Sequence, residues 1–328
     1  MGAQVFAYIV HKGGRADDTA LELVSAAKKI DAGATVTALV LGSGADVDAV
    51  AGQVANTYKA VWKVADAALA YPNAELIRPL LQKVLPAGAI MLLPTDSFGM
   101  DLGPGLSVKM NAAYCADVID FAGFNGTKLV AHRQEYSGQV YAKMEIDVAG
   151  GAVITVRPGA FAADETGGAG GAVEDKTSVA LAGGLPAVKR KFLEVKPAEV
   201  GDVDITKSDV LVSIGRGIES QDNLEVAFEL AKAMGAEVSC SRPIVDSKWL
   251  EKSRQVGTSG QTVKPKVYMA MGISGAFQHL GGLKGNPFVV AVNKNAKAPF
   301  FQVADVGIVG NILELMPVLT EKITEMKG

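Results

Sequence analysis

The residues that could do chemistry gather in one stretch, Val267 to Gly282, which reads Val-Tyr-Met-Ala-Met-Gly-Ile-Ser-Gly-Ala-Phe-Gln-His-Leu-Gly-Gly. The apolar run at its start predicts a short, buried parallel strand. Gly-Ile-Ser-Gly then predicts a tight turn into a helix, starting at Ser274, that carries Gln278 and His279. A strand, a glycine turn and a helix start bring free backbone N–H groups and a positive dipole end to one point. The stretch therefore predicts a nucleotide or dinucleotide site.

Similar turns follow the other apolar runs of the C-terminal segment. Strands are predicted over residues 210–214, 238–240 and 288–292 beside the one that begins at Val267, and helices over 223–234 and, with an early interruption at Pro317, 312–326. In a doubly wound sheet, ligands bind at the carboxyl ends of the strands. Because polar and glycine-rich turns follow most of these strands, we expect the turns to converge on one crevice.

Each polar group in these turns has a binding interpretation and a plainer one. Arg216 could pair with a phosphate or be a solvated turn arginine, and Arg242 could stabilise an anionic cofactor or form an internal salt bridge. Residues 256–259 could present N–H groups and hydroxyls to a ring edge or form an ordinary turn. Asp305 could bind ribose hydroxyls or cap a turn or helix, and residues 293–295 could hold an adenine or form a polar loop. The residues alone leave these alternatives open.

The composition does not favour metal or hydrolase chemistry. Histidines and cysteines are few and far apart in sequence: His11, His132, His279, Cys115 and Cys240. Neither a cluster of metal ligands nor a disulfide framework is expected from them. No Gly-x-Ser-x-Gly elbow marks a hydrolase. No catalytic acid, base or nucleophile is predicted.

The N-terminal half alternates between apolar runs and helical periodicity. Strands are expected over residues 3–10, 35–41, 58–64 and 89–93, helices over 17–30, 45–55 and 74–85, short extended runs over 129–133, 139–146 and 152–156, and a further strand over 188–195. Strands and helices with short connections are typical of a parallel sheet covered on both faces. The change of pattern after residue 128 indicates an antiparallel addition.

A glycine-rich run, residues 158–173, follows these elements and contains Gly-Gly-Ala-Gly-Gly. It has few apolar residues and no period, so it predicts a flexible linker or surface excursion. A phosphate loop is disfavoured because no strand leads directly into the run and no helix pattern leaves it.

Length and charge limit the number of domains and the kinds of binding partner that are expected. A chain of 328 residues with 49% apolar and 20% charged residues predicts two globular domains, here placed at residues 1–200 and 201–328. The net charge of −3 disfavours binding to nucleic acids or membrane surfaces through charge. No apolar stretch is long enough for a membrane span or a signal peptide, and the sparse cysteines favour a reducing compartment, so a cytoplasmic protein of bacterial or archaeal type is expected.

The motifs of the C-terminal segment resemble those of the alpha subunits of electron transfer flavoproteins. Five further pieces fall in that family's order beside Gly272-Ile-Ser-Gly-Ala-Phe-Gln-His-Leu, namely Ser213-Ile-Gly-Arg-Gly217, Ser241-Arg242, Gln255-Val-Gly-Thr-Ser-Gly260, Val292-Asn-Lys294 and Gln302-Val-Ala-Asp305. The likeness is close over residues 207–328 and extends to the N-terminal part only in general shape. It implies an N-terminal parallel-sheet α/β layer and a C-terminal doubly wound, Rossmann-like domain that binds FAD.

The resemblance also implies which residues meet each part of FAD. The pyrophosphate would lie near Arg216, Asn293 and the turn Ser274, Gly275, Ala276 and Phe277, and the adenosine near Asp305 and Val306. The isoalloxazine would lie near Arg242, Val256, Gly257, Thr258, Ser259 and His279. Ser241, Gln255 and Gln278 complete the set of residues expected to bind the cofactor. Many members carry Gln-Thr-Gly where this chain has Thr258-Ser259-Gly260; serine keeps the hydroxyl expected to reach flavin N5.

By the same resemblance, the chain is an electron carrier that forms a heterodimer with a beta subunit. Its redox partners would be acyl-CoA-type dehydrogenases or ferredoxin-like donors and an acceptor, and the N-terminal layer would dock the beta subunit. The complex could also belong to the electron-bifurcating type. Two alternatives use the same crevice: an NAD-dependent dehydrogenase, which lacks a nameable acid–base pair, and a nucleotide-binding subunit without redox turnover.

Overall fold

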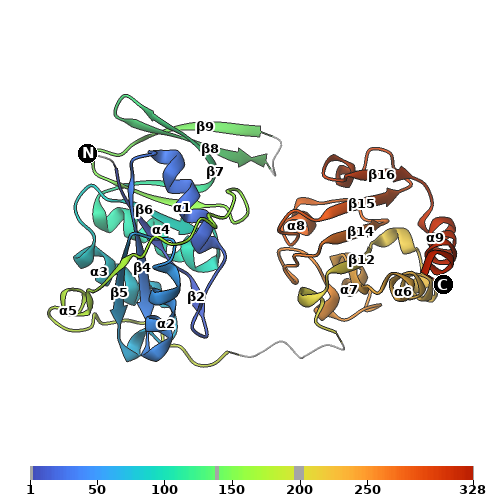
Figure 1. The fold of residues 1–328 in the computed structure, drawn as a ribbon, viewed down its shortest axis with the longest axis horizontal. Helices are drawn as coiled ribbons and strands as arrows, with labels where there is room; N and C mark the ends of the chain where they lie inside the picture. Colours follow the sequence, from blue (N-terminus) through green and yellow to red (C-terminus); the bar gives the residue numbers. More distant parts are fainter. Residues whose placement is uncertain (1–2, 137–139, 196–202, 328) are drawn as a thin grey trace. The chain divides into compact units, whose positions relative to one another are not determined.

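The computed structural model describes residues 3–136, 140–195 and 203–327. The chain divides into two compact units, Met1–Leu193 and Glu194–Gly328, which are described separately (Figure 1). Within the described residues, no helix is long and apolar enough to cross a membrane.

Unit 1 is built on a nine-stranded sheet in the order β11-β5-β4-β1-β6-β10-β7-β8-β9. Pairing is parallel from β11 to β7 and antiparallel from β7 to β9, so the sheet is mixed. The strands are β1 (Gln4–Tyr8), β4 (Thr35–Gly42), β5 (Ala60–Ala65), β6 (Ile90–Pro94), β7 (Ala113–Asn125), β8 (Lys128–Glu135), β9 (Val140–Asp147), β10 (Ala152–Val156) and β11 (Ala172–Asp175), beside the small hairpin β2 (His11–Lys12) and β3 (Arg15–Ala16).

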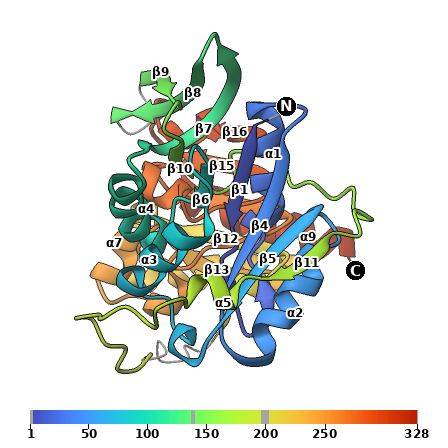
Figure 2. The same cartoon turned by 90° about the vertical axis from the view of Figure 1, so that its left-hand side faces the viewer.

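Helices cover both faces of the parallel part of this sheet (Figure 2). Alternate side chains of β1 enter two cores: Val5 and Ala7 pack with α1 (Thr19–Ile30) and α2 (Gly44–Val54), whereas Phe6 and Tyr8 pack with α3 (Ala74–Val84) and α4 (Ser97–Met110). The short helix α5 (Thr177–Ala180) adds its buried Ala180 to the second core.

Two parts of unit 1 differ from the sequence expectations. Helix α4 was not predicted, because its sequence holds three glycines and Pro104, which are poor helix formers. The strand predicted over residues 188–195 is wrong: this segment has no strand, and its residue Leu193 is 88% exposed. Its backbone is held instead by the Glu75 carboxylate, which accepts hydrogen bonds from the N–H groups of Lys189 and Arg190.

The glycine-rich run over residues 158–173 lies on unit 1 and leads into β11, the edge strand beside β5. The N–H of Gly171 donates to the carbonyl of Ala55 at 2.8 Å. A Cβ on Gly171 would lie 1.9 Å from the carbonyl oxygen of Tyr58. At this point glycine is therefore required by close backbone packing, which favours a structural role over a phosphate loop.

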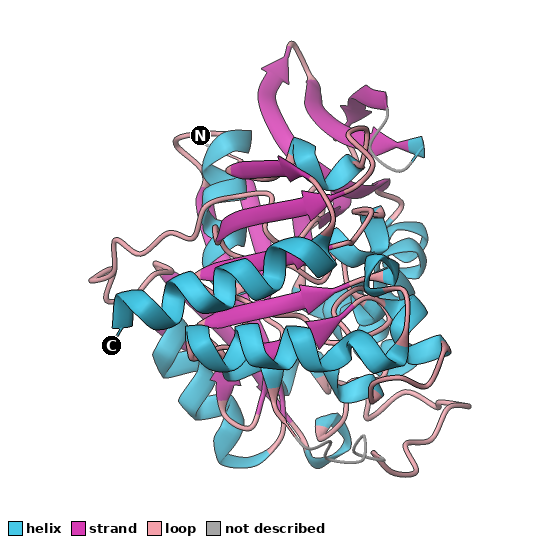
Figure 3. Cartoon of the chain, turned by 90° about the vertical axis from the view of Figure 1, so that its right-hand side faces the viewer, coloured by secondary structure: helices cyan, strands magenta, loops and turns pink. Residues whose placement is uncertain are grey.

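Unit 2 is a five-stranded, fully parallel sheet in the order β13-β12-β14-β15-β16. The strands are β12 (Val210–Ile214), β13 (Glu237–Cys240), β14 (Val267–Met271), β15 (Phe288–Asn293) and β16 (Val306–Val309). Helices α6 (Leu224–Met234) and α9 (Ile312–Lys327) lie side by side across one face (Figure 3), and α9 continues through Pro317 without interruption.

The other face of this sheet carries a second core built mainly from loops. Tyr268 of β14 packs there against Phe300 and Val256 in the same cluster, whereas Met269 and Met271 face α6 and α9. The short helices α7 (Arg242–Asp246) and α8 (Phe277–Leu280) follow β13 and β14. The helix predicted to start at Ser274 begins three residues later, because Gly275 has the left-handed φ of +86° and Ala276 a ψ of 144°.

Candidate functional site

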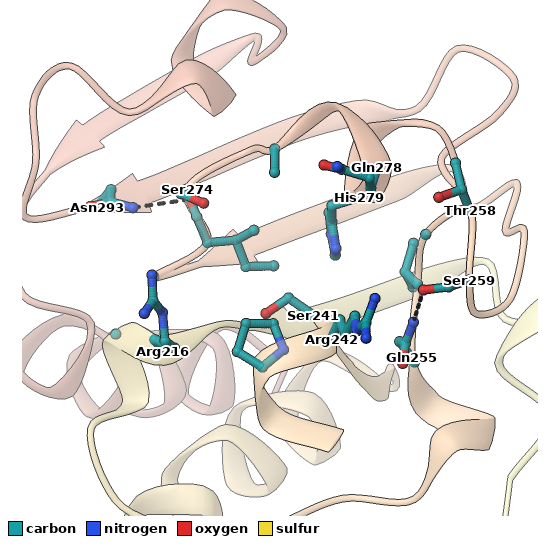
Figure 4. A pocket seen from close by; sticks show the side chains of 17 residues that line it. Arg216, Ser241, Arg242, Gln255, Thr258, Ser259, Ser274, Gln278, His279 and Asn293 are labelled. Carbon is teal, nitrogen blue, oxygen red and sulfur yellow. Dashed lines mark hydrogen bonds between the residues drawn. The ribbon is translucent and has the colours of Figure 1, made fainter. Parts of the chain in front are cut away.

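A cavity of about 490 Å³ lies at the carboxyl ends of the strands of unit 2. Residues that follow β12, β13 and β14, and the last residue of β15, contribute to it (Figure 4). Seventeen residues line it: Arg216, Gly217, Ser241, Arg242, Pro243, Gln255, Val256, Gly257, Thr258, Ser259, Gly272, Ile273, Ser274, Ala276, Gln278, His279 and Asn293.

Three glycines allow the turns after β12 and β14 to pack directly against each other. Gly272 has φ +67°, and a Cβ built on it would lie 2.7 Å from the Cα of Gly217. A Cβ on Gly215 would lie 2.5 Å from the carbonyl oxygen of Gly272. Any side chain at these positions would force the two turns apart. The Gly-Arg-Gly and Gly-Ile-Ser-Gly motifs thus form one cradle of backbone at the cavity.

The turn after β14 offers unused hydrogen-bond donors. The backbone N–H groups of Ser274, Gly275 and Ala276 have no acceptor among the residues that the structure describes. Asn293, at the end of β15, fixes this turn by donating its side-chain amide to the carbonyl of Ile273 at 2.9 Å. Successive free N–H groups at a glycine turn form an anion-binding concavity.

Arg216 follows β12 on the same side and is exposed. It makes no ion pair with any described residue. Its guanidinium, labelled in Figure 4 beside Ser274 and Asn293, is available for an anion at the turn after β14.

A loop over residues 255–261 forms another wall and is fixed by backbone bonds to its neighbours. The N–H of Val256 donates to Cys240 of β13 at 2.9 Å, and the N–H of Thr258 donates to Gln278 of α8 at 2.8 Å. The buried Gln255 donates its side-chain amide to Oγ of Ser259 at 2.9 Å. Because Ser259 is the acceptor in that bond, its own O–H remains available to a ligand.

Arg242 lies at the rim of the cavity, after the buried Ser241. Its side chain is 69% exposed, and its Nε lies 3.4 Å from Oδ2 of Asp246, one turn along α7. Arg242 therefore forms a salt bridge and also lines the cavity, and its role towards a ligand stays a prediction. A surface pair of this kind contributes little to stability, so it leaves the guanidinium free to change partners.

His279 is the buried polar group of the cavity, and it points from α8 towards the turn that carries Ser241 (Figure 4). Its Nε2 lies 2.7 Å from the hydroxyl of Tyr268, which itself lies 2.7 Å from Oγ of Ser213. Its Nδ1 is buried and has no hydrogen-bond partner among the described residues. Burial lowers the pKa of His279 to about 4, and the backbone of Val256 opposes this shift. The imidazole is thus neutral near pH 7.

Thirteen of the seventeen residues predicted from the sequence line this one cavity. The structure adds Gly217, Pro243, Gly272 and Ile273, which were expected from the sequence to be turn residues rather than ligand contacts. Gly275 and Phe277 do not line it: Gly275 packs against Phe300, and the side chain of Phe277 is 52% exposed.

Asp305 and Val306 do not line the cavity either, because they stand at the amino end of the sheet. Val306 pairs with Val290, whereas the cavity residue Asn293 pairs with Val309, three residues and roughly 10 Å further along the strands. The carboxylate of Asp305 accepts the N–H of Val289 at 2.8 Å. Its observed role is therefore to tie the starts of β15 and β16 together.

The carboxyl end of β16 instead brings Gly310 and Asn311 beside the cavity residue Asn293. The N–H of Gly310 donates to the carbonyl of Asn293 at 3.1 Å. Asn311 stands at the start of α9, where its side chain accepts the N–H of Leu313 at 3.2 Å. This pair was not predicted from the sequence, because β16 itself was not predicted. The Gly-Asn dipeptide before a long helix was the signal that could have indicated it.

Comparison with known proteins agrees with this division of the chain. A model of the electron transfer flavoprotein domain matches residues 5–181, and a model of the electron transfer flavoprotein FAD-binding domain matches residues 204–284. The electron transfer flavoprotein subunit alpha of Mycobacterium leprae is 33% identical over 99% of this chain and 100% of its own length. The chain belongs to the alpha subunits of electron transfer flavoproteins.

Other relatives of the family show the same relationship. The subunit alpha of Syntrophomonas wolfei is 33% identical over 98% of this chain and 99% of its own length. A FixB protein of Clostridium saccharobutylicum is 37% identical over 72% of this chain and 70% of its own length. As an electron transfer flavoprotein alpha subunit, the chain is an FAD-binding electron carrier, and its identity implies a beta subunit as partner.

The residues of the cavity fit FAD. Unpaired backbone N–H groups and Arg216 suit an anionic pyrophosphate, and the orphaned Nδ1 of His279 suits the polar edge of a ring. The volume of about 490 Å³ lies within the range of small-molecule sites. Bound FAD supplies reversible electron transfer, and the protein supplies its orientation and electrostatic surroundings.

Proposed function

We propose that this electron transfer flavoprotein alpha subunit passes electrons from acyl-CoA-type dehydrogenases or ferredoxin-like donors to an acceptor, and that the cavity residues serve binding and electrostatics alone. One observation carries the proposal: the seventeen lining residues include no carboxylate, lysine or cysteine. Their one buried titratable side chain, His279, is kept neutral by burial. A hydride-transferring dehydrogenase needs an acid or base for its substrate, so that alternative is disfavoured.

The pyrophosphate is assigned to the turn Ser274–Ala276, with Arg216 and Asn293 beside it. This assignment is supported by the unpaired N–H groups of the turn and by the guanidinium that lacks a described ion-pair partner. The chain's own residues bind and orient the phosphates here, through backbone N–H groups and the guanidinium of Arg216.

The isoalloxazine is assigned to the space between Arg242, the loop 256–259 and His279. The O–H of Ser259 and the Nδ1 side of His279 are the uncommitted polar groups that support it. We place the adenosine beside Asn293 and Asn311, at the carboxyl end of β16, rather than near Asp305 and Val306 as the sequence suggested.

Removing Arg216 tests the pyrophosphate assignment. Arg216→Ala should weaken FAD binding about 10- to 100-fold, the value of a lost charge-assisted hydrogen bond, while the fold is kept. Fluorescence titration of FAD into the full chain measures the loss. Lys322→Ala is the matched control, because Lys322 is an exposed cation of α9 that pairs with Glu325 outside the cavity. Equal affinities for the two variants would contradict the assignment.

The beta subunit is proposed to dock on unit 1, where the antiparallel strands β8 and β9 extend from the parallel sheet (Figure 1). Tyr141 on the edge strand β9 is 65% exposed, and Tyr136, directly after β8, is 79% exposed. Exposed aromatic side chains beside an unpaired strand edge are typical of a docking surface. Tyr141→Glu should reduce copurification of the two subunits. Val108→Glu, at a residue of α4 that is 79% exposed, is the control that should leave copurification intact.

The redox partners are tested by direct reduction of the FAD-loaded heterodimer. Catalytic amounts of an acyl-CoA dehydrogenase with its substrate, and separately a reduced ferredoxin, are mixed with it while flavin absorption is followed. Bleaching by one of the two identifies the donor class. No bleaching by either, with FAD reducible by dithionite, would contradict both.

A further inference from the structure

One buried charged residue of unit 2, Arg254, stands directly before the loop 255–261 and does not line the cavity. Its Nη1 donates to the carbonyl of Val238 in β13 at 2.7 Å and lies 3.8 Å from Oε2 of Glu237. Its Cζ lies 5.4 Å from the centroid of the Phe228 ring on α6. A guanidinium keeps its charge when it is buried, so these partners hold it at one position.

Arg254 completes the outer edge of β13. This strand is the last of its sheet on the side of β12, so the backbone groups on its outer edge need partners from outside the sheet. The carbonyl of Cys240 accepts the N–H of Val256 at 2.9 Å, and the carbonyl of Val238 accepts the guanidinium. The side chain of Arg254 thus supplies a hydrogen bond that a neighbouring strand would otherwise supply, and it joins the start of the loop to the sheet.

The position of the next residue, Gln255, decides where Ser259 lies. The side-chain amide of the buried Gln255 donates to Oγ of Ser259 at 2.9 Å, and its carbonyl accepts the N–H of Gln261 at 2.6 Å. A Cβ on Gly260 would lie 2.3 Å from the same carbonyl oxygen, so the loop returns directly against Gln255. Because Gln255 follows Arg254 in the chain, a shift of the arginine moves the loop with it.

We propose that Arg254 is a positioning residue of the cofactor site, which holds Gln255 at the edge of β13 and thereby fixes the hydroxyl of Ser259 at the cavity wall. The inference rests on the proposed placement of the flavin ring beside the loop 256–259. A buried guanidinium is costly to desolvate, and its hydrogen bond to Val238 offsets that cost only in this arrangement. The loop is therefore ordered before the ligand arrives, which lowers the entropic cost of binding.

Amide hydrogen exchange in the full chain without FAD, followed by NMR, tests the positioning itself. Arg254→Met keeps an unbranched apolar side chain but removes the donor and the charge. The N–H groups of Val256 and Gln261 should then exchange about 10- to 100-fold faster relative to the N–H of Gly272, the value of a lost hydrogen bond to a charged group. Arg254→Lys should recover part of the protection, because an ammonium can donate to the same carbonyl but lacks the planar fork.

Leu230→Ala is the matched control for a general loss of stability. Leu230 is fully buried on α6, in the core between that helix and the sheet, and it belongs to neither the loop nor the cavity. Its truncation leaves a void in that core and destabilises unit 2 as a whole. Exchange at Val256 and at Gly272 should therefore become faster to the same extent, so that the ratio of their rates stays unchanged.

Titration with FAD and the absorption spectrum of the bound cofactor connect the positioning to the site. Ser259→Ala should weaken FAD binding about fivefold, the value of one neutral hydrogen bond. Arg254→Met should weaken binding at least as much and shift the absorption bands of bound FAD in the same direction, whereas Leu230→Ala should leave the bands unmoved. The double variant should bind FAD as Arg254→Met alone does, because the hydroxyl is already misplaced.

The outcomes are distinct. Equal exchange ratios in Arg254→Met and Leu230→Ala would make Arg254 a stabilising residue only and overturn the proposal. Losses of FAD affinity that add in the double variant would overturn it as well. If the exchange follows the proposal but Ser259→Ala binds FAD as tightly as the unmodified chain, the positioning by Arg254 stands and the placement of the flavin ring beside this loop is wrong.

Discussion

The two units end their parallel strands in opposite ways. After β6 of unit 1 comes Asp96, whose carboxylate accepts the N–H of Gly99 at 2.6 Å and so fills the start of α4. After β14 of unit 2 comes a turn whose N–H groups at Ser274 and Gly275 have no acceptor among the described residues. The same architecture thus carries an anion of its own in unit 1 and offers the position to a ligand in unit 2.

The difference has a local cause in each unit. In unit 1 a Cβ on Gly99 would lie 2.1 Å from the carbonyl oxygen of Pro94, so the helix begins tightly against its strand. Burial raises the pKa of Asp96, and the charge of Asp17 adds to the shift. In unit 2 the left-handed Gly275 delays the helix to Phe277 and holds the turn open. Gly99 therefore lets α4 start directly against its strand, whereas Gly275 keeps α8 away from the end of its strand.

A side chain in the turn after β14 should have the largest effect. Gly272→Ala places a methyl group 2.7 Å from Gly217 at a φ of +67°, which should destabilise unit 2 by about 2–5 kcal/mol and abolish FAD binding. Gly88→Ala is the control in unit 1, since Gly88 has φ +77° but nothing within 4 Å of its Cβ position. Urea unfolding and FAD titration compare them. Similar losses in both variants would mean that backbone strain, not the contact between the turns, decides.

Acidification should have the next largest effect, because it should destabilise unit 2 at a higher pH than unit 1. The folded pKa of His279, about 4, lies below its usual 6.5, so the unfolded chain takes up a proton first and unit 2 loses stability as pH falls from 6.5 towards 4. The loss by pH 4.5 should be about 2–3 kcal/mol. In unit 1, Lys28 lowers the pKa of Asp164 to about 2, so stability present above pH 4 is lost only as pH falls further towards 2.

The two tryptophans, Trp62 in unit 1 and Trp249 in unit 2, allow separate measurement. Urea unfolding of Trp62→Phe at pH 7 and pH 4.5 follows unit 2, and Trp249→Phe follows unit 1. Adding His279→Asn should remove the pH dependence from the unit 2 signal. A dependence that survives this substitution would assign the effect to other groups.

These contrasts show where the sequence was informative. Strands such as Val210–Ile214 were predicted because both of their faces are buried and the apolar run is continuous. Glycine turns after strands predicted the cavity, since their positions follow from topology. Helix α4 was missed because packing and the Asp96 cap overcome its glycines, and Asp305 was misplaced because sequence cannot tell which end of an unpredicted strand a residue occupies.

A smaller effect is expected from a change at the start of α4 in unit 1. Asp96→Ala removes the carboxylate that caps α4 and should destabilise unit 1 by about 1–2 kcal/mol. FAD affinity should be unchanged. Added phosphate should restore part of the lost stability if the start of α4 can accept an outside anion. Unfolding of unit 1 is measured in the Trp249→Phe background with and without about 50 mM phosphate, because an anion that binds only the folded state raises its stability by mass action. If phosphate does not raise the stability, the start of α4 is closed to outside anions by packing.

The smallest effect is predicted for Arg242, at the rim of the open site. Its charge faces the proposed flavin ring but is 69% exposed and paired with Asp246. For a solvated pair about 4 Å apart the Coulomb energy is about 1 kcal/mol, which corresponds to roughly 40 mV for a one-electron couple. Arg242→Ala should therefore retain FAD and lower its first midpoint potential by about that amount, and Arg242→Lys should recover part of it.

Asp246→Asn sharpens this prediction because it frees the guanidinium from its partner. Its first midpoint potential should rise, and the shift should shrink as ionic strength increases, since exposed charges are screened within about 10 Å at 0.1 M salt. Spectroelectrochemistry at two salt concentrations compares the three variants. Potentials that stay equal in Arg242→Ala and Asp246→Asn would make this arginine a surface salt-bridge partner only. The cavity of unit 2 would then act on FAD through hydrogen bonds alone. The turn after β14 would differ from the turn after β6 in its access to a ligand rather than in charge.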